Sequence, residues 1–444
     1  MKKDVLILGS GLVTRPMIRY LLAKGYRITV ASNTPDRAAR MIDGHPNGVS
    51  VSWEANDETG LSNMIAGHDL TVSLLPWTFH LSVARQCLKH GKNMVTTSYV
   101  KPEMRALDGE ARKAGIILLN ELGLDPGIDH MSAMRIIDHI HAKGGSVNEF
   151  YSICGALPAP EAANNPFRYK FSWSPKGVIL AGNNDAKYLQ HRKLISIPSA
   201  ALFKNPFHID FPEIGNLEVY PNRDSLLYQD LYGIPEAETL YRGTFRYPGW
   251  CEILDTMKQL NLFSSDSFDM TGMSFADLLL RQASGASNIQ VNGPAFSATL
   301  TGEALEWLGM QSKTPMNRNI DSPFEVVADK MIEKMTLGSG ERDMVVMQHL
   351  FLAVYPEGKK EVIRSRMLDF GIPDGDTAIA RTVALPAAIG VDMILKGKIK
   401  AKGVHIPVIP EIYHPILDQL QCLGIKMDEE YNLSNENIWV LSRS

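Results

Sequence analysis

Cysteine is scarce and scattered in this chain of 444 residues. The four cysteines are widely separated and form no C-x-x-C pair: Cys87, Cys154, Cys251 and Cys422. Such spacing offers neither a disulfide framework nor a cysteine-based zinc site, and free thiols are typical of a reducing cytosol. Histidines suggest no metal site either, because His139 and His141 are two positions apart on a predicted helix and point in different directions. We therefore predict that the protein binds no metal ion.

A strong net charge and a long apolar run are also missing. The formal net charge is -4 at pH 7, which gives no general attraction to nucleic acid or to an anionic membrane surface. The apolar run at residues 5–8 is too short for a signal-peptide core. The later run at residues 383–395 is interrupted by Pro386, Gly390 and Asp392, which argues against a membrane span. We expect a cytoplasmic protein that binds neither nucleic acid nor membrane.

Internal repeats and low-complexity segments are absent, and the composition is that of a globular protein. Apolar residues make up 45% and charged residues 21% of the chain, which is ordinary for a folded protein. Because 444 residues exceed what one hydrophobic core usually organises, we predict two or three domains.

The first 125 residues alternate between short β-branched runs and helical patterns. The strand-like runs lie at residues 5–8, 28–32, 49–52, 70–75, 93–97 and 116–120. The helix-like patterns lie at residues 14–24, 35–41, 58–66, 79–89 and 102–114. This alternation predicts an α/β fold with a parallel sheet covered by helices on both faces. Ligands of such sheets bind beyond the carboxyl ends of the strands.

The pattern changes after residue 126, where less regular sequence rich in proline and aromatic residues begins to appear. The later predicted elements are a helix at 130–142, a mostly helical region at 251–334, two strands at 343–355 and 361–370, and a helix at 377–396. We therefore predict a second, mixed α/β domain with a helical insert.

A glycine-rich turn, Gly-Ser-Gly-Leu-Val-Thr at residues 9–14, follows the first predicted strand and opens the first predicted helix. Gly9 would allow the tight turn, and Gly11 would let the backbone approach a pyrophosphate bound at the helix N-terminus. Thr14 stands where a third glycine is usual, which weakens the motif taken alone. An ordinary turn is the alternative, but the strand before it and the helix after it favour dinucleotide binding.

The end of the second predicted strand lacks the acidic residue that usually holds the ribose 2′-hydroxyl of NAD. The residues there are Ser32, Asn33 and Thr34, with Arg37 beyond. Hydroxyl groups and a guanidinium suit the 2′-phosphate of NADP, so we favour NADP as the cofactor and keep NAD as the alternative. Arg37 is equally explained as a solvated helix residue.

Longer segments of the chain carry a more specific pattern. They lie at residues 9–16 (GSGLVTRP), 95–99 (VTTSY), 120–130 (NELGLDPGIDH), 169–174 (YKFSWS), 220–225 (YPNRDS), 242–247 (RGTFRY) and 340–343 (GERD). In this order they resemble segments of saccharopine reductase, the glutamate-forming saccharopine dehydrogenase family. The resemblance extends from residue 4 to about residue 415.

The resemblance implies a reaction, a fold and a domain organisation. The reaction is the reversible oxidation of saccharopine to glutamate and 2-aminoadipate 6-semialdehyde, with a nicotinamide cofactor. The implied fold combines a Rossmann-type dinucleotide-binding domain, a mixed α/β substrate domain that also mediates dimerisation, and a helical domain. On this chain we place the NADP-binding domain at 1–128, with 377–444 packing back on it, the substrate domain at 129–250 and 335–376, and the helical domain at 251–334. We expect a homodimer that acts on a small molecule.

The resemblance also implies the residues of the site. Together with the glycine turn, the implied cofactor contacts are Gly9, Ser10, Gly11, Leu12, Val13, Ser32, Asn33, Thr34, Asn56, Asp57, Leu75, Thr97, Ser98, Leu124, Asp125, Pro126 and Trp173. The implied substrate contacts are Ser98, Tyr99, Asp125, Arg223, Thr244, Phe245 and Arg246. Asn33 departs from the fungal-type pattern, which has an arginine after the second strand, so one clamp on the 2′-phosphate is missing here.

The chemistry of saccharopine matches two of these residues. The molecule carries three carboxylates, and arginine binds carboxylates in bidentate fashion better than lysine does. Arg223 and Arg246 meet that need. The alternative for Arg223 is a surface arginine paired with Asp224.

Proton transfer needs a further group. Hydride leaves the carbon beside the secondary amine only after the ammonium has lost a proton, and hydrolysis of the imine then requires more proton transfers. The candidates are Asp125, ranked first, with Tyr99 and Cys154. Each has an alternative: Asp125 could cap the following helix, Tyr99 could stack on the nicotinamide, and Cys154 could be a small core residue.

Two other functions stay open. A related imine-reducing enzyme such as carboxynorspermidine dehydrogenase would act on a substrate with fewer carboxylates, so it would need Arg223 and Arg246 less. A nucleotide-binding protein without catalysis would bind NADPH and never consume it.

Overall fold

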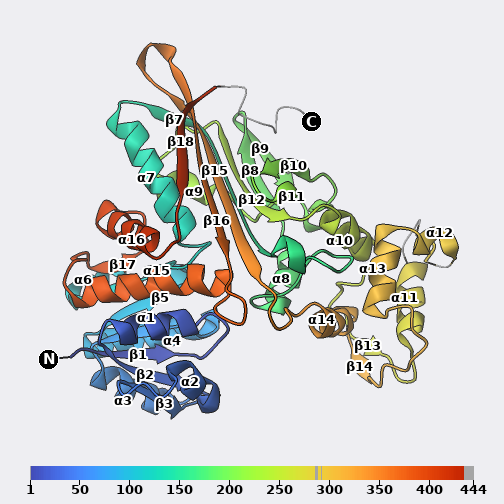
Figure 1. Ribbon diagram of the computed structural model, residues 1–444, viewed down its shortest axis with the longest axis horizontal. Coiled ribbons are helices and arrows are strands. Elements are labelled where there is room, and N and C mark those ends of the chain that lie inside the picture. Colours follow the sequence, from blue (N-terminus) through green and yellow to red (C-terminus); the bar gives the residue numbers. More distant parts are fainter. Residues whose placement is uncertain (1, 286–288, 292, 435–444) are drawn as a thin grey trace. The chain divides into compact units, whose positions relative to one another are not determined.

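The computed structural model describes residues 2–285, 289–291 and 293–434 (Figure 1). The chain forms two compact units. Unit 1 consists of Met1–Gly145, Tyr355–Glu357 and Ser365–Glu430, and unit 2 of Ser146–Val354, Gly358–Arg364 and Tyr431–Ser444. The three-domain division proposed above stays a prediction, and its parts at residues 1, 286–288, 292 and 435–444 lie outside the described residues.

Unit 1 is built on a seven-stranded sheet with the order β17-β6-β5-β4-β1-β2-β3. Its strands are β1 (Asp4–Leu8), β2 (Arg27–Ser32), β3 (Gly48–Ser52), β4 (Leu70–Ser73), β5 (Asn93–Thr96), β6 (Ile117–Leu119) and β17 (Gly403–His405). All neighbouring strands pair in parallel, which confirms the predicted parallel sheet and α/β fold. The strand order reverses between β1 and β4, and such a reversal is where doubly wound sheets bind dinucleotides.

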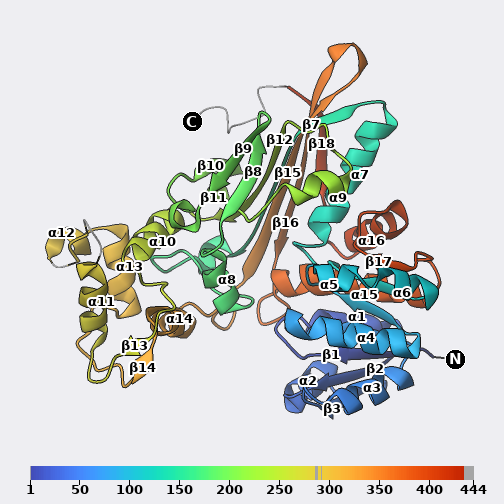
Figure 2. The same cartoon turned by 180° about the vertical axis from the view of Figure 1, so that it is seen from behind.

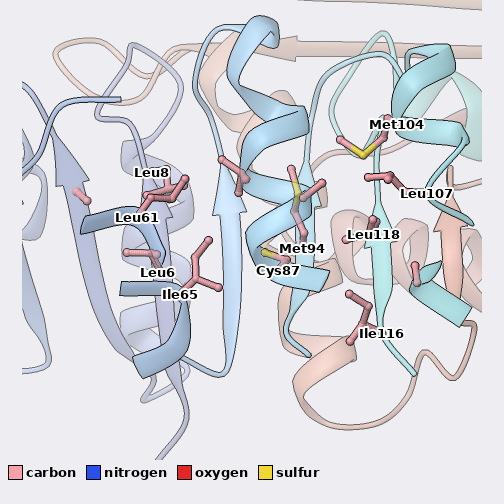
Figure 3. Packing of buried hydrophobic residues seen from close by; sticks show 14 of the residues in the cluster. Leu6, Leu8, Leu61, Ile65, Cys87, Met94, Met104, Leu107, Ile116 and Leu118 are labelled. Atoms are coloured by element: carbon pink, nitrogen blue, oxygen red, sulfur yellow. The ribbon is translucent and has the colours of Figure 1, made fainter. Parts of the chain in front are cut away.

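Helices cover both faces of this sheet. The helices of unit 1 are α1 (Arg15–Ala23), α2 (Pro35–Ile42), α3 (Glu58–Gly67), α4 (His80–His90), α5 (Pro102–Arg105), α6 (Asp108–Lys113), α7 (Ile128–Ala142), α15 (Ala378–Leu395) and α16 (Pro410–Cys422), of which α7 and α16 pack on each other. On one face, Leu6 and Leu8 of β1 lie beside Leu61 and Ile65 of α3, and Cys87 of α4 lies beside Met94 in the same buried cluster (Figure 3). The alternate β1 residues point to the opposite face and are also fully buried, so the sheet is covered on both sides.

Helix α15 is the most apolar of these helices. By length and composition it is the one helix in the described residues that could cross a membrane, yet 83% of it is buried inside the fold. Its Asp392 carboxylate accepts a hydrogen bond of 2.7 Å from the Tyr26 hydroxyl and forms an ion pair with Lys396. A buried apolar helix with polar anchors of this kind belongs to the core of unit 1.

A nine-stranded mixed sheet lies mainly in unit 2, with the order β10-β11-β12-β7-β15-β16-β18 and with β8 and β9 added beside β12. Its strands are β7 (Ser146–Pro158), β8 (Ala186–Gln190), β9 (Lys193–Ile197), β10 (Phe207–Phe211), β11 (Gly215–Pro221), β12 (Thr239–Arg246), β15 (Asp343–Val354), β16 (Lys360–Phe370) and β18 (Asp428–Leu433). The two strands predicted at 343–355 and 361–370 are confirmed by β15 and β16. Strands β7 to β12 were not predicted.

The remaining helices of unit 2 include the predicted helical region. They are α8 (Pro175–Ala181), α9 (Leu227–Tyr232), α10 (Trp250–Gln259), α11 (Phe275–Ser284), α12 (Pro294–Ser297), α13 (Leu300–Leu308) and α14 (Pro323–Lys334). Helices α11 to α14 gather into one group with the short strands β13 (Phe268–Asp269) and β14 (Ile320–Asp321) (Figure 2). Ser274 and Ser322 cap α11 and α14 through their hydroxyl groups, as residues at these positions commonly do.

Candidate active site

The glycine turn joins β1 to α1. Gly9 has a φ of 103°, and a Cβ atom there would lie 3.0 Å from the carbonyl oxygen of Leu74, so only glycine fits without strain. A Cβ at Gly11 would meet nothing within 4 Å, which leaves open space over the turn. Thr14 takes the place of the third glycine, fully buried, with its hydroxyl 3.4 Å from the Gly9 carbonyl oxygen.

The N-terminus of α1 is suited to an anion. Thr14 is its N-cap residue, and its side chain makes no capping hydrogen bond to the helix. The first backbone N–H groups of a helix have no partner within the helix and carry a partial positive charge. This helix end therefore offers donors to a pyrophosphate.

Three hydroxyl groups meet at the carboxyl end of β2. The Ser10 hydroxyl lies 2.8 Å from that of Ser32 and 2.9 Å from that of Thr34, and the latter two are 3.1 Å apart. We call this set the hydroxyl triangle. Asn33 between them is exposed, and Arg37 on α2 is half-buried. The triangle and its surroundings offer donors to a 2′-phosphate and no carboxylate at the end of the strand.

Other implied cofactor residues lie near the ends of β3 and β4. Asp57 caps α3 by accepting a hydrogen bond of 2.8 Å from the Gly60 N–H, so this side chain has a local structural role. Asn56 directly precedes it, and Leu75 follows β4 and packs against the core of the sheet.

The loops that follow β5 and β6 lie together. After β5 come Thr97, Ser98 and Tyr99, and after β6 comes the segment that contains Leu124 and Asp125. The Tyr99 hydroxyl donates a hydrogen bond of 2.8 Å to Oδ1 of Asp125, so two of the three candidate proton-transfer groups are in direct contact. The bond from Asp125 to Pro126 is a cis peptide. The first turn of α7 is held instead by Asp129, which accepts a 2.6 Å hydrogen bond from the Gly127 N–H.

Glu121 links these two loops. Its Oε1 accepts a hydrogen bond of 2.8 Å from the Val100 N–H, and its Oε2 lies 2.7 Å from Nε2 of His130 on α7. The residue is 4% exposed, and its backbone adopts a left-handed φ of 57°. Such a conformation in a non-glycine residue is uncommon and is maintained by the surrounding contacts.

His80 links the ends of β4 and β5. Its Nδ1 lies 2.8 Å from the Ser73 hydroxyl, and its Nε2 lies 2.8 Å from the Ser98 hydroxyl and 3.4 Å from that of Thr96. Burial lowers the pKa of His80 to about 4, so the imidazole is neutral at pH 7.

Arg246 ends strand β12 in unit 2 and is 5% exposed. Its guanidinium carbon lies 4.9 Å from the ring centre of Tyr169, 5.4 Å from that of Trp250 and 5.8 Å from that of Tyr220. One guanidinium nitrogen donates to the Phe245 carbonyl oxygen at 2.7 Å, and Nε has no hydrogen-bond partner. No carboxylate of the described residues forms an ion pair with Arg246. A buried cation without a counter-ion is costly, and this cation is therefore suited to bind an anion.

Strand pairing places other candidates near Arg246. Thr244 is paired with Cys154 of β7 and lies on the same face of β12 as Arg246, because side chains alternate along a strand. Phe245 points to the other face, is fully buried and packs edge-on against Phe211 at 5.8 Å between ring centres. The Phe245 side chain therefore lies in the core, and the backbone carbonyl group of Phe245 contacts the Arg246 guanidinium.

Two further candidates lie in turns of unit 2. Arg223 is exposed in the turn after β11 and has a left-handed φ of 52°. The neighbouring Asp224 accepts a hydrogen bond of 2.9 Å from the Leu226 N–H. Trp173 is partly buried just before α8.

The implied site residues thus form two groups, one in each unit. The first group lies at the carboxyl edge of the parallel sheet and contains every implied cofactor residue except Trp173. The second contains Cys154, Trp173, Arg223 and Thr244 to Arg246. The described residues bring together no group of His, Cys, Asp and Glu side chains that could hold a metal ion.

Sequence reasoning missed several neighbours of these residues. Glu121 lies inside the segment 120–130 that carried the resemblance, and its position after a strand could have drawn attention to it. His80 follows β4 by only a few residues, again at the carboxyl edge of the sheet. Tyr169 and Tyr220 lie in two of the segments that carried the resemblance, but only the fold brings their rings and that of Trp250 together around Arg246.

Comparison with known proteins assigns nearly the whole chain to one family. Residues 5–119 match the family model of the saccharopine dehydrogenase NADP binding domain, and residues 123–425 that of the saccharopine dehydrogenase C-terminal domain. A Schizosaccharomyces pombe protein named saccharopine dehydrogenase [NADP(+), L-glutamate-forming] is 38% identical over 96% of this chain and 98% of its own length. The Bos taurus protein named mitochondrial alpha-aminoadipic semialdehyde synthase is 38% identical over 96% of this chain but 47% of its own length.

A solved structure shows the same fold. The apo saccharopine dehydrogenase (L-Glu forming) from Saccharomyces cerevisiae aligns with a TM-score of 0.88 and 34% identity, covering 97% of this chain and 99% of that one.

Proposed function

This chain belongs to the saccharopine dehydrogenase family, and we propose that it catalyses the reversible NADP-dependent oxidation of saccharopine to L-glutamate and 2-aminoadipate 6-semialdehyde. The observation that carries the proposal is the full-length match to relatives of that name, 38% identical over 96% of this chain. The protein is accordingly an oxidoreductase that acts on a CH–NH bond.

The carboxyl edge of the parallel sheet fits the cofactor. The glycine turn leaves room above Gly11, and the uncapped N-terminus of α1 offers backbone donors to the pyrophosphate. The hydroxyl triangle suits the 2′-phosphate, because all three hydroxyls can turn their protons toward an anion. When bound, NADP supplies the acceptor for the hydride. In this proposal the hydroxyl triangle selects NADP over NAD, because position 33 is Asn33 and not an arginine.

Arg246 binds a carboxylate of saccharopine in this proposal. Its guanidinium is buried among aromatic rings and lacks a carboxylate partner within the described residues, so a substrate carboxylate completes its electrostatic environment. The exposed Arg223 is the second candidate for a substrate carboxylate. Thr244 lies on the same face of β12 as Arg246 and offers a hydroxyl group.

Asp125 takes the proton from the substrate ammonium. Its Oδ1 accepts a hydrogen bond from the Tyr99 hydroxyl, which holds the carboxylate in one orientation. Once the amine nitrogen has a free lone pair, hydride can leave the adjacent carbon, and water can then add to the imine. The same Asp125 and Tyr99 pair can return protons during hydrolysis, with Cys154 as the further candidate.

An absorbance assay at 340 nm tests the proposed reaction. Purified protein is mixed with saccharopine and either NADP or NAD, and glutamate formation is measured in parallel. We expect turnover with NADP to exceed turnover with NAD. Binding of NADPH without consumption, in the presence of glutamate and the semialdehyde, would instead support a non-catalytic nucleotide-binding protein. Turnover of carboxynorspermidine but not of saccharopine would support the related imine-reducing enzyme.

The assembly and location follow as expectations from the same family membership. We expect a homodimer formed through the substrate domain at 129–250 and 335–376, with the helical domain at 251–334 and the NADP-binding domain at 1–128. Light scattering of the purified chain measures the oligomer directly. We also expect a cytoplasmic location, although the Bos taurus relative is named as mitochondrial.

A further inference from the structure

A buried chain of hydrogen bonds runs from Ser73 through His80 to Ser98 in unit 1. Ser73 ends β4 and is fully buried, His80 begins α4 and is 5% exposed, and Ser98 follows β5 and is partly exposed. The contacts of the imidazole with the Ser73 and Ser98 hydroxyls are each 2.8 Å long, and the Thr96 hydroxyl lies farther from Nε2, at 3.4 Å. Neither Ser73 nor His80 is among the residues assigned to the reaction, so the proposed reaction does not explain this series of hydrogen bonds.

The number of protons shared by these three side chains determines which group donates and which accepts in each hydrogen bond. The imidazole is neutral, so one ring nitrogen donates and the other accepts. Among the described residues, Nδ1 of His80 is the hydrogen-bond partner of the Ser73 hydroxyl. If Nδ1 donated to Ser73, the Ser73 proton would be buried without an acceptor, which is costly. Ser73 therefore donates to Nδ1, and the ring proton lies on Nε2.

The consequence falls on Ser98. Nε2 of His80 donates to the Ser98 oxygen, so the Ser98 hydroxyl proton cannot point back at the ring and is directed elsewhere. Because Ser98 is partly exposed and directly precedes Tyr99, its proton is available to a bound molecule. We propose that His80 is a positioning residue, which with Ser73 fixes Ser98 as a hydrogen-bond donor to a carbonyl or carboxylate oxygen of the bound cofactor or substrate.

This inference rests on the proposed function, since it assigns a role within the same site. Two ligands could provide the oxygen: the carboxamide of the nicotinamide or a carboxylate of saccharopine. Separate measurements distinguish them, namely the Kd for NADPH by fluorescence titration and the KM for saccharopine at saturating NADP.

The test compares Ser98→Ala, His80→Leu, His80→Gln and Ser73→Ala with the wild-type enzyme. We expect Ser98→Ala and His80→Leu to raise one of the two constants about tenfold, the usual effect of losing one such hydrogen bond. Ser73→Ala should raise the same constant less. The imidazole remains in place, but without the Ser73 donor its proton can lie on either ring nitrogen. His80→Gln should restore most of the affinity, because its amide can again donate to Ser98 and accept from Ser73.

A double-mutant cycle gives the decisive readout. If His80 acts through Ser98, the Ser98→Ala/His80→Leu enzyme should be no worse than Ser98→Ala alone. His90→Leu is the matched control, since His90 ends the same helix and also contacts a serine hydroxyl, that of Ser62 at 2.8 Å. It should leave both constants unchanged.

Three results would overturn the inference: wild-type constants in both His80→Leu and Ser73→Ala, full additivity in the double variant, or no recovery in His80→Gln. If His80→Leu does not fold, His80→Gln and Ser73→Ala still decide the question. A wild-type protein that does not consume saccharopine would contradict the proposed function instead, while the NADPH titration would still test the role of His80.

Discussion

Arg246 has an unusual environment for a charged side chain. Lysine and arginine are rarely buried unless a carboxylate accompanies them. Here the guanidinium is surrounded by the rings of Tyr169, Trp250 and Tyr220, which attract a cation through their faces but do not neutralise it. The folded protein thus keeps a desolvated positive charge in place before any substrate arrives.

This arrangement predicts opposite effects of Arg246→Met on activity and on stability. Loss of the carboxylate contact should lower kcat/KM for saccharopine by about 100-fold or more. The free energy of unfolding should stay the same or rise, because an uncompensated buried charge has been removed. Steady-state kinetics and urea unfolding measure the two quantities. The control is Arg192→Met, which breaks an exposed ion pair with Glu238 and should alter neither. A marked loss of stability with normal kinetics would contradict this account.

The hydroxyl triangle makes a prediction about the cofactor. In Ser32→Ala, and in Thr34→Ala, the Kd for NADPH should rise about tenfold while the Kd for NADH stays within about twofold, because NADH has no 2′-phosphate to lose a contact. Asn33→Arg should act in the opposite direction and tighten NADPH binding alone. Ser52→Ala, at the exposed end of the neighbouring strand β3, serves as the control. Equal losses for the two nucleotides would mean that the triangle shapes the turn and does not contact the phosphate.

His80 makes the stability of the protein depend on pH. Burial lowers the pKa of His80 from 6.5 to about 4, so below pH 6.5 the unfolded chain takes up a proton that the folded protein does not. The stabilisation is therefore complete above pH 6.5 and decreases as the pH falls toward 4. Between pH 7 and pH 5 the wild type should lose about 2 kcal/mol more than His80→Gln. Urea unfolding at both pH values measures the difference. His90→Gln should lose as much unfolding free energy between pH 7 and pH 5 as the wild type does. The same loss in His80→Gln would count against a buried neutral imidazole.

At the scale of elements, the loops after β5 and β6 act as one structure because Glu121 joins them. Glu121→Ala would leave the Val100 N–H and the His130 ring without their shared partner, at a cost of about 2 to 4 kcal/mol in the free energy of unfolding. Because Tyr99 and Asp125 lie on these two loops, we expect kcat to fall at least tenfold even in the folded fraction. Glu121→Gln, which keeps the acceptor for Val100, should retain more activity. Glu58→Ala on α3 is the exposed control, and equal activity of the two Glu121 variants would show that the Val100 contact is dispensable.

The same elements show what the sequence could and could not predict. Strands β1 to β6 were predicted because short β-branched runs alternate with helical patterns. All of them are largely buried, as is typical of parallel strands, except the partly exposed edge strand β3. Strand β7 was missed because it is buried almost throughout and so lacks the alternation of a half-buried strand. Strand β17 has three residues, and only its pairing with β6 makes it a strand. The candidate site shows the same division. Its predicted residues after β5 and β6 come from local sequence patterns, whereas the contacts that His80 and Glu121 make between loops appear only in the fold.

At the scale of the whole molecule, the chain leaves unit 1 after Gly145 and returns to complete it. The returning segment Ser365–Glu430 contributes α15, α16 and β17. Helix α15 is almost wholly buried and contacts α1 and β5, while α16 packs on α7. The nucleotide-binding unit is therefore discontinuous in sequence, and its N-terminal part alone would expose the apolar surface that α15 covers.

A fragment of residues 1–145 should consequently fail to form a native unit, with weak near-UV circular dichroism and no NADPH binding. Joining residues 1–145 to 365–430 through a flexible glycine-serine linker should restore both, because the linker replaces only the excursion into unit 2. The same fusion with Ile389→Asp, which places a charge at a fully buried position of α15, is the matched control and should remain unfolded. If residues 1–145 alone unfolded cooperatively and bound NADPH as well as the fusion did, α15 would be an accessory to a self-sufficient domain, and the discontinuous unit would have to be redrawn.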